Sequence, residues 1–153
     1  MNNKGYTLIE VITTVSILLI IIGPVTLVFD TWYKNFYIDN SSVLLDQKSR
    51  DIMDSILTDL RMDSNETSTS QDDNKTLFIN DSLKYEFNSL ENKLLRNGES
   101  VLNNTNIQVI DFNVKEEKPE GYDTNIIKIY IKLKSDYDVE VELESTFRKK
   151  YIN

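Results

Sequence analysis

Hydrophobic and polar positions divide the chain into an apolar beginning and a polar remainder. No charged residue occurs between Glu10 and Asp30, and residues 11–29 are mainly Val, Ile, Leu, Phe and Thr. As a helix, this run of about 19 residues spans roughly 28 Å, close to the thickness of the hydrocarbon core of a bilayer. The rest of the chain is too small to bury a helix that is apolar all round. The run therefore predicts a transmembrane helix.

The helical period continues beyond the apolar run but becomes amphipathic. Residues 32–61 carry apolar side chains at steps of three and four, with charged side chains on the other faces. No Gly or Pro occurs from residue 25 to residue 61, which predicts one long helix. Within the run, Gly23 and Pro24 predict a kink or local unwinding, because Pro has no amide donor; a tolerated Pro in a membrane helix is the alternative. Four aromatic residues just after the run suit a membrane-interface belt, subunit packing or both: Trp32, Tyr33, Phe36 and Tyr37.

After residue 62 the period changes to two. Residues 62–75 are mostly polar and predict a loop, and residues 115–123 predict another. Between and after them, six short stretches of alternating residues read as strands: 77–79, 83–87, 94–96, 107–114, 127–133 and 137–143. Asn97-Gly98 is a turn signal, and inward and outward apolar positions in 107–114 predict a bulge or burial on both faces. We expect an α+β fold, with an antiparallel sheet of about four to six strands on the outer half of the helix.

The last two stretches also predict a register. Each has one apolar face, and both faces must point into the same core. Pairing Ile129 with Val141 and Ile131 with Val139 achieves this, and it sets Lys132 opposite Asp138 on the solvent face. The connection between the strands would then be the short loop of residues 134–136.

Composition removes several classes of function. The chain of 153 residues has a net charge of −8, which argues against a nucleic-acid partner, since phosphate binding needs a basic surface. It contains no His and no Cys, which excludes most zinc sites, thiol- and His-dependent catalysis, and disulfides. No phosphate-binding loop, nucleophile motif or calcium-loop spacing is present. We therefore expect no catalytic residue, no cofactor and no metal.

A charged residue stands at the entrance of the apolar run. Glu10 would cost on the order of 2.5–3.5 kcal/mol at the bilayer centre and less at its edge, so it needs a function and a partner. An ordinary secretory signal fits poorly, because no small-residue cleavage site follows the run. Lys4 before the span and acidic residues after it place the N-terminus in the cytoplasm by the positive-inside rule.

The segment Lys4-Gly5-Tyr6-Thr7-Leu8-Ile9-Glu10-Val11 resembles the processing site of type IV pilins and of the pseudopilins of type II secretion systems. This resemblance implies cleavage between Gly5 and Tyr6 by prepilin peptidase and N-methylation of Tyr6. It also implies that Glu10 pairs with the N-terminal amine of a neighbouring subunit. The physics agrees, since an ammonium and a carboxylate offset each other's desolvation in a low-dielectric bundle.

The same resemblance implies the domain plan and the partners. We expect a leader at 1–5, a membrane-spanning and filament-core helix at 6–29, its amphipathic continuation at 30–61 and a sheet head at 62–153. The expected partners are other pilin or pseudopilin subunits, prepilin peptidase, the membrane, and an assembly platform with its ATPase. The subunit would cross the cytoplasmic membrane once, with its head outside the cytoplasm, and would then enter a filament at the cell surface.

Two alternatives stay open at this point. The span can instead be the permanent anchor of an extracytoplasmic enzyme or sensor, although a mere anchor needs neither Gly5 nor Glu10. Within the family, the irregular, weakly apolar head and the absence of a disulfide pair favour a minor pilin or a J-type minor pseudopilin over a major pilin. The segments 56–61 and 93–96 also resemble those minor subunits.

Overall fold

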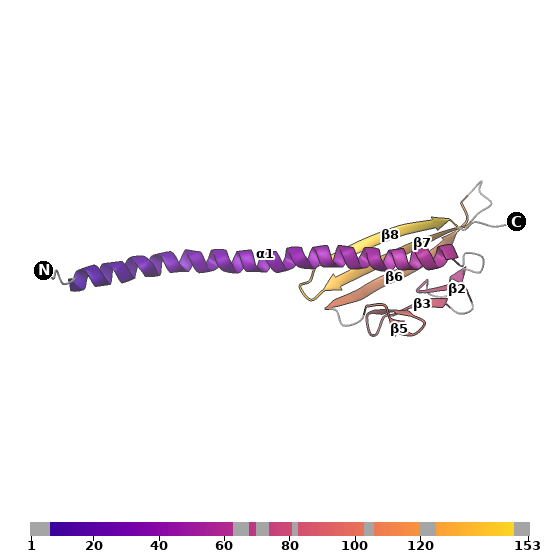
Figure 1. The fold of residues 1–153 in the computed structure, drawn as a ribbon, viewed down its shortest axis with the longest axis horizontal. Coiled ribbons are helices and arrows are strands. Elements are labelled where there is room, and N and C mark those ends of the chain that lie inside the picture. The colour runs from indigo at the N-terminus through magenta and orange to yellow at the C-terminus, as the bar shows by residue number, and fades with distance from the viewer. Residues whose placement is uncertain are drawn as a thin grey trace. The chain divides into compact units, whose positions relative to one another are not determined.

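The computed structural model describes residues 7–62, 68–69, 74–80, 83–102, 106–119 and 125–148. This part of the chain consists of one helix followed by strands (Figure 1). The elements are α1 (Leu8–Met62), β1 (Ser68–Thr69), β2 (Thr76–Asn80), β3 (Leu83–Asn88), β4 (Lys93–Arg96), β5 (Glu99–Ser100), β6 (Ile107–Glu117), β7 (Ile126–Ser135) and β8 (Glu140–Arg148). The chain divides into two compact units, Met1–Asp39 and Asn40–Asn153, and α1 contributes to both.

The helix α1 is continuous through Gly23 and Pro24. Pro24 has no amide hydrogen to donate to the preceding turn. Nearby, the hydroxyl of Thr26 donates a hydrogen bond of 2.8 Å to the carbonyl oxygen of Gly23. The kink or local unwinding expected at Gly23 and Pro24 stays a prediction.

The strands form two antiparallel sheets. One contains five strands in the order β1–β2–β3–β4–β5, and the other contains three in the order β6–β7–β8. The expected α+β architecture, a long helix packed on antiparallel strands, is therefore confirmed. The strands are divided between two sheets rather than joined in one. This division was not predicted from the sequence, because a period of two identifies a strand but not its neighbour. Two short strands, β1 and β5, were not expected, and β6 extends three residues into the predicted loop of 115–123.

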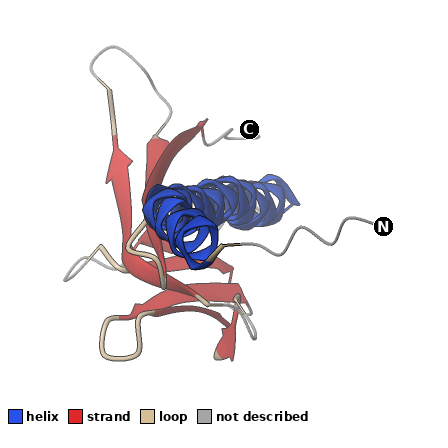
Figure 2. Ribbon diagram, turned by 90° about the vertical axis from the view of Figure 1, so that its left-hand side faces the viewer, coloured by secondary structure: helices blue, strands red, loops and turns tan. Residues whose placement is uncertain are grey.

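The core of the second unit lies between the two sheets and the last turns of α1. Figure 2 shows the two groups of strands set at an angle to each other, and the last turns of α1 share one core with them. The buried helix residues recur at helical spacing, namely Leu45, Ser49, Ile52, Met53, Ile56 and Leu60. They pack against buried strand residues, including Leu77, Ile79, Tyr85, Phe112, Ile127, Ile129, Ile131 and Leu133. The amphipathic period of residues 45–60 thus buries one face of α1 on the strands.

One polar cluster fixes α1 to the five-stranded sheet. The carboxylate of Asp59 on α1 accepts a hydrogen bond of 2.5 Å from the hydroxyl of buried Tyr85 on β3. The same carboxylate lies 3.0 Å from Nη2 of Arg96 on β4. Burial raises the pKa of Tyr85 well above its ordinary value, and the hydrogen bond to Asp59 is the second largest cause of this rise. The Tyr85 hydroxyl is therefore protonated at neutral pH and donates to Asp59.

Local turn chemistry is confirmed where the sequence marked it. Asn97 and Gly98 join β4 to β5 with φ angles of 53° and 86°, the pair of positive values that a tight hairpin turn requires. The predicted hairpin between 77–79 and 83–87 corresponds to β2 and β3. The bulge allowed in 107–114 lies between Val109 and Asp111.

The predicted register of the last hairpin is wrong. Ile129 lies opposite Ser145 rather than Val141, and Ile131 lies opposite Leu143 rather than Val139. Lys132 lies opposite Glu142, whereas Asp138 belongs to the turn and has a φ angle of 64°. Each face of the hairpin nevertheless carries the residue types expected for it, since shifting by an even number of residues preserves the alternation.

The loop and the ends of the strands explain the shift. Two backbone hydrogen bonds close the turn, from the amide of Ser135 to the carbonyl of Val139 and from the amide of Asp138 to the carbonyl of Ser135. Because β8 continues to Arg148, Phe147 packs against the core opposite Ile127. Tyr137, which has a hydroxyl to hydrate, is 52% exposed instead. The observed register thus directs the fully apolar ring of Phe147 toward the core and leaves Tyr137 exposed.

Candidate functional site

The structure describes the amino-terminal site from residue 7 onward. Lys4, Gly5 and Tyr6 lie outside the described residues, so the cleavage and methylation site stays a prediction from the sequence. Glu10, the predicted assembly residue, lies in the first turn of α1. Its position is set by Thr7, the residue that precedes the helix.

Thr7 and Glu10 form a capping box. One carboxylate oxygen of Glu10 accepts hydrogen bonds from the backbone amide of Thr7 at 2.8 Å and from its hydroxyl at 3.0 Å. In return, the amide of Glu10 donates to the Thr7 hydroxyl at 3.4 Å. The first turn of a helix has unsatisfied amides and a partial positive charge, so a carboxylate is stabilised there. This role of Thr7 was not predicted from the sequence, although the spacing of Thr7 and Glu10 is the capping-box signature.

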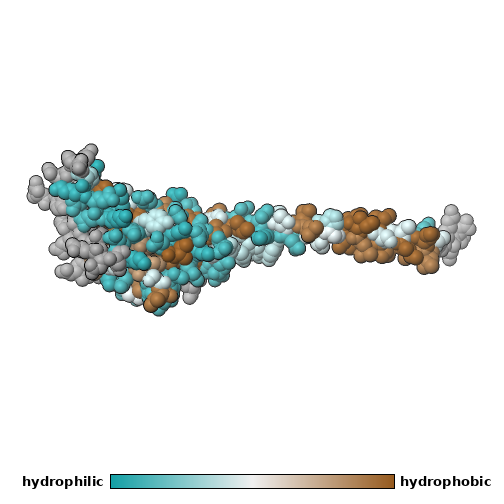
Figure 3. All heavy atoms as spheres, turned by 180° about the vertical axis from the view of Figure 1, so that it is seen from behind, coloured by the Kyte–Doolittle hydropathy of each residue, from teal (hydrophilic) through white to brown (hydrophobic). Residues whose placement is uncertain are grey.

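The apolar run that follows is exposed along its whole length. Leu8–Met62 contains a window of mean hydropathy 2.5, of which none is buried within the protein. Figure 3 shows the hydrophobic colour gathered on the amino-terminal part of α1. Exposed fractions of the large side chains range from 44% at Val25 to 77% at Leu8. Length, composition and exposure together make this a helix that can cross a membrane.

The hydroxyl residues of the run bond to their own helix. Thr14 and Ser16 donate to the carbonyl oxygens of Glu10 and Ile12, at 2.6 and 2.8 Å. Thr13 donates to the carbonyl oxygens of Ile9 and Glu10. These bonds satisfy hydroxyl groups that would otherwise be unpaired in lipid, where each unsatisfied polar group is costly.

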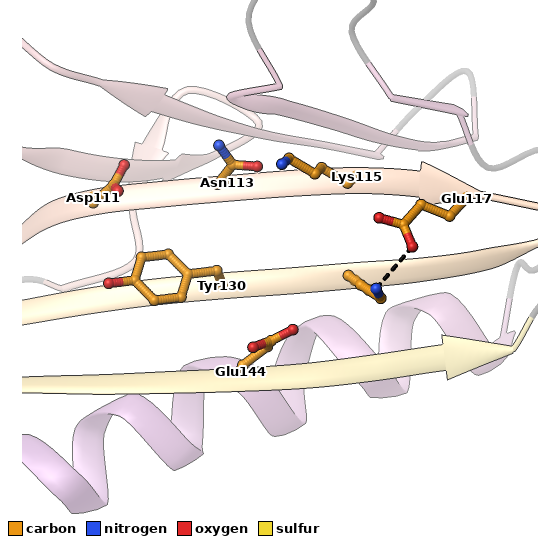
Figure 4. Close-up of a pocket in the computed structure, with 7 residues that line it drawn as sticks. Asp111, Asn113, Lys115, Glu117, Tyr130 and Glu144 are labelled. Carbon is orange, nitrogen blue, oxygen red and sulfur yellow. Dashed lines mark ion pairs between the residues drawn. The ribbon is translucent and has the colours of Figure 1, made fainter.

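A second candidate site is a shallow groove on the polar face of the three-stranded sheet. Figure 4 shows its lining residues, which project from β6, β7 and β8, namely Asp111, Asn113, Lys115, Glu117, Lys128, Tyr130 and Glu144. Asn113, Tyr130 and Glu144 occupy one row across the three strands. Glu117 and Lys128 form an ion pair of 2.7 Å. This pair lowers the pKa of Glu117 and raises that of Lys128.

Ion pairs also order the neighbouring part of this face. Nζ of Lys132 lies 2.9 Å from carboxylate oxygens of both Glu140 and Glu142, which raises the lysine pKa. Among the described residues, no group of three acidic side chains is arranged to hold a metal ion. Several lysines and carboxylates of this face are joined in ion pairs, as is common on a solvated surface.

Comparison with protein families finds one match, and it falls on the amino-terminal site. The family described as the prokaryotic N-terminal methylation motif matches residues 1–26. The match includes Gly5, Tyr6 and Glu10, and it ends just after Pro24. Neither the comparison with curated proteins nor the comparison with solved structures finds a match.

The methylation motif and the exposed apolar helix indicate the same kind of protein. Such a motif implies processing by prepilin peptidase and assembly with other pilin subunits. The helix that continues from the motif supplies the membrane anchor of such a subunit. The chain thus carries a prepilin-type N-terminal methylation motif at residues 1–26 on a long helix packed on antiparallel strands, and it is consistent with the type IV pilin and pseudopilin family.

Proposed function

We propose that this protein is a minor structural subunit of a type IV pilus or a type II secretion-like pseudopilus. One observation carries the proposal: the methylation motif at residues 1–26 continues into α1, whose amino-terminal apolar side chains are exposed in the described chain. Such a surface needs lipid before assembly and neighbouring helices afterwards. The subunit has a mechanical role and performs no catalysis.

In the proposed mechanism, the span first holds the subunit in the cytoplasmic membrane as a single pass. The short amino-terminal segment lies in the cytoplasm, as the position of Lys4 favours, and the head lies outside it. Prepilin peptidase then cuts after Gly5, which creates a new ammonium group at Tyr6. An assembly platform and its ATPase transfer the subunit from the bilayer into the filament.

Glu10 is the residue that directs this transfer. Its carboxylate already accepts two hydrogen bonds from Thr7, which lessens the cost of holding it at the membrane. These bonds engage one carboxylate oxygen, Oε2, and each carboxylate oxygen has more than one acceptor site. The ammonium at Tyr6 of a neighbouring subunit is therefore accommodated without breaking the capping box.

The test compares Glu10→Ala with a matched variant, Asp30→Ala, which removes an acid from the same helix outside the motif. Both variants should insert into the membrane, but only Glu10→Ala should reduce incorporation into sheared filaments, by tenfold or more. Leaving a buried charge without its partner costs on the order of 3 kcal/mol. Filament incorporation of Glu10→Ala at the wild-type level would contradict the pairing role. Wild-type protein that stays wholly in the membrane would instead favour a permanent anchor.

A further inference from the structure

Four aromatic side chains, Trp32, Tyr33, Phe36 and Tyr37, form an ordered group on α1 that we call the aromatic patch. The rings of Trp32 and Phe36 are stacked with centroids 5.7 Å apart. The rings of Tyr33 and Tyr37 meet edge to face at 4.6 Å, and their hydroxyls are hydrogen-bonded at 2.7 Å. Phe36 and Tyr37 join the two pairs, with centroids 5.9 Å apart. The patch is thus a continuous surface of rings with its polar hydroxyls gathered together.

The patch is exposed although its rings contact one another. Trp32, Tyr33 and Phe36 retain 62%, 57% and 48% of their accessible surface. At 100° per residue, the four side chains lie within about 140° of the helix circumference. Thr31, Lys34 and Asn35 occupy other directions at the same height. The patch therefore offers one broad amphipathic side to a partner outside the described chain.

The height of the patch matches the edge of a bilayer. With residues 11–29 centred at Ile20, the backbone of Trp32 lies about 18 Å from the midplane and that of Tyr37 about 25 Å. The hydrocarbon core ends near 15 Å from the midplane, and the headgroup region ends near 22 Å. Side chains lean toward the helix N-terminus, and an average tilt of about 20° lowers them further. All four rings therefore fall in or beside the headgroup layer.

We propose that the aromatic patch anchors the subunit in the lipid headgroup layer at the carboxyl end of the span. The proposal rests on the membrane stage of the proposed function. It commits to lipid as the partner, because the patch continues the exposed apolar helix at the depth where aromatic residues favour the interface. The rings supply apolar contact to the acyl-chain border, and the two paired hydroxyls supply hydrogen-bonding groups for headgroups and water. The patch then sets the depth of α1 before filament entry.

The test uses Trp32 as a natural probe, because it is the only Trp in the chain. The full-length protein is reconstituted in phosphatidylcholine and phosphatidylglycerol vesicles whose acyl chains are brominated either near the glycerol or near the chain terminus. We expect Trp32 emission to shift to the blue relative to Trp in water. We also expect bromine near the glycerol to quench it at least about twofold more strongly than bromine near the terminus.

Two matched variants calibrate depth in a Trp32→Phe background. Ile20→Trp should be quenched most by bromine near the chain terminus, and Leu44→Trp should be quenched by neither lipid. For wild type, stronger quenching from the chain terminus would contradict the anchor, as would emission typical of water. Blue-shifted emission that no lipid quenches would show that the patch contacts protein, and it would also contradict the anchor. Failure of Ile20→Trp to respond would instead contradict the membrane span itself.

Discussion

At the scale of single residues, the first turn of α1 shows how a carboxylate is accommodated at a membrane boundary. Glu10 is held by the amide and the hydroxyl of Thr7, so the group predicted to meet a neighbouring subunit is already oriented in the single chain. The hydroxyl of Thr7 serves both as acceptor for the Glu10 amide and as donor to its carboxylate. Thr7 is therefore a positioning residue for Glu10.

Replacing Thr7 by Val should release the first turn. Loss of an N-cap hydroxyl costs about 1 kcal/mol, so the amides of Leu8, Ile9 and Glu10 should exchange hydrogen about fivefold faster in micelles. Thr7→Ser, which keeps the hydroxyl, is the matched control and should exchange like wild type. Equal exchange rates in Thr7→Val and wild type would show that the capping box does not hold the turn.

Tyr85 gives the head a predictable response to alkaline pH. Its pKa in the folded chain is raised above the ordinary value of 10.0, which applies to the unfolded chain. At a pH between the unfolded and the folded pKa, the folded state therefore keeps a proton that the unfolded state loses. The stabilising effect of this group is complete below about pH 10 and is lost as pH rises further. The free energy of unfolding should therefore fall above about pH 10.

Tyr85→Phe tests this account. It should lower the free energy of unfolding by about 1.5–3 kcal/mol at neutral pH, because a hydrogen bond to a charged group is lost. It should also make the decline above about pH 10 shallower. Urea unfolding of the full chain in micelles, followed by near-ultraviolet circular dichroism, measures both effects. Tyr137→Phe, at an exposed turn, is the control, and an unchanged decline in Tyr85→Phe would contradict the assignment.

At the scale of elements, the sequence predicted which segments form strands better than how they pair. The alternation in 127–133 and 137–143 identified β7, the first four of the nine residues of β8, and the inner faces of both segments. The observed partner of Ile129, Ser145, lies four residues after the predicted partner, Val141. A register shift by an even number of residues leaves the inner and outer faces unchanged, so alternation alone does not select between these two partners. That choice depends on the turn at 135–139 and on Phe147, whose burial is a tertiary effect.

Cysteine cross-linking checks the observed register, because the natural chain contains no Cys. Lys132→Cys with Glu142→Cys joins directly opposed positions and should form a disulfide under mild oxidation. Lys132→Cys with Asp138→Cys represents the register expected from the sequence and should form far less. The reverse ranking, measured as the mass of the oxidised chain, would show that the hairpin is paired differently.

The amino-terminal site was more accessible to sequence reasoning than the polar cluster of the head. Its determinants, from Gly5 to Glu10, are contiguous, so a local motif is sufficient to mark them. Asp59, Tyr85 and Arg96 are brought together from positions 26 and 37 residues apart. Each of these residues is ordinary in its own segment, and the cluster forms only because α1 packs on β3 and β4.

At the scale of the whole molecule, the two units suit different surroundings. The described part of Met1–Asp39 exposes large apolar side chains, whereas Asn40–Asn153 contains the buried core and the charged faces. A free helix with such an apolar surface is not stable in water by itself, so this unit needs lipid or other helices. The net charge of −8 of the whole chain favours hydration of the charged faces.

The most direct test of the central claim is the mass of the amino terminus of protein extracted from cells that contain prepilin peptidase. We expect a chain that begins at Tyr6, carries one added N-methyl group and lacks residues 1–5. A peptidase-deficient strain is the control and should retain Met1. A chain that keeps Met1 in the presence of the peptidase, or one cut beyond residue 29, would contradict the assignment of this protein as a pilin-type subunit.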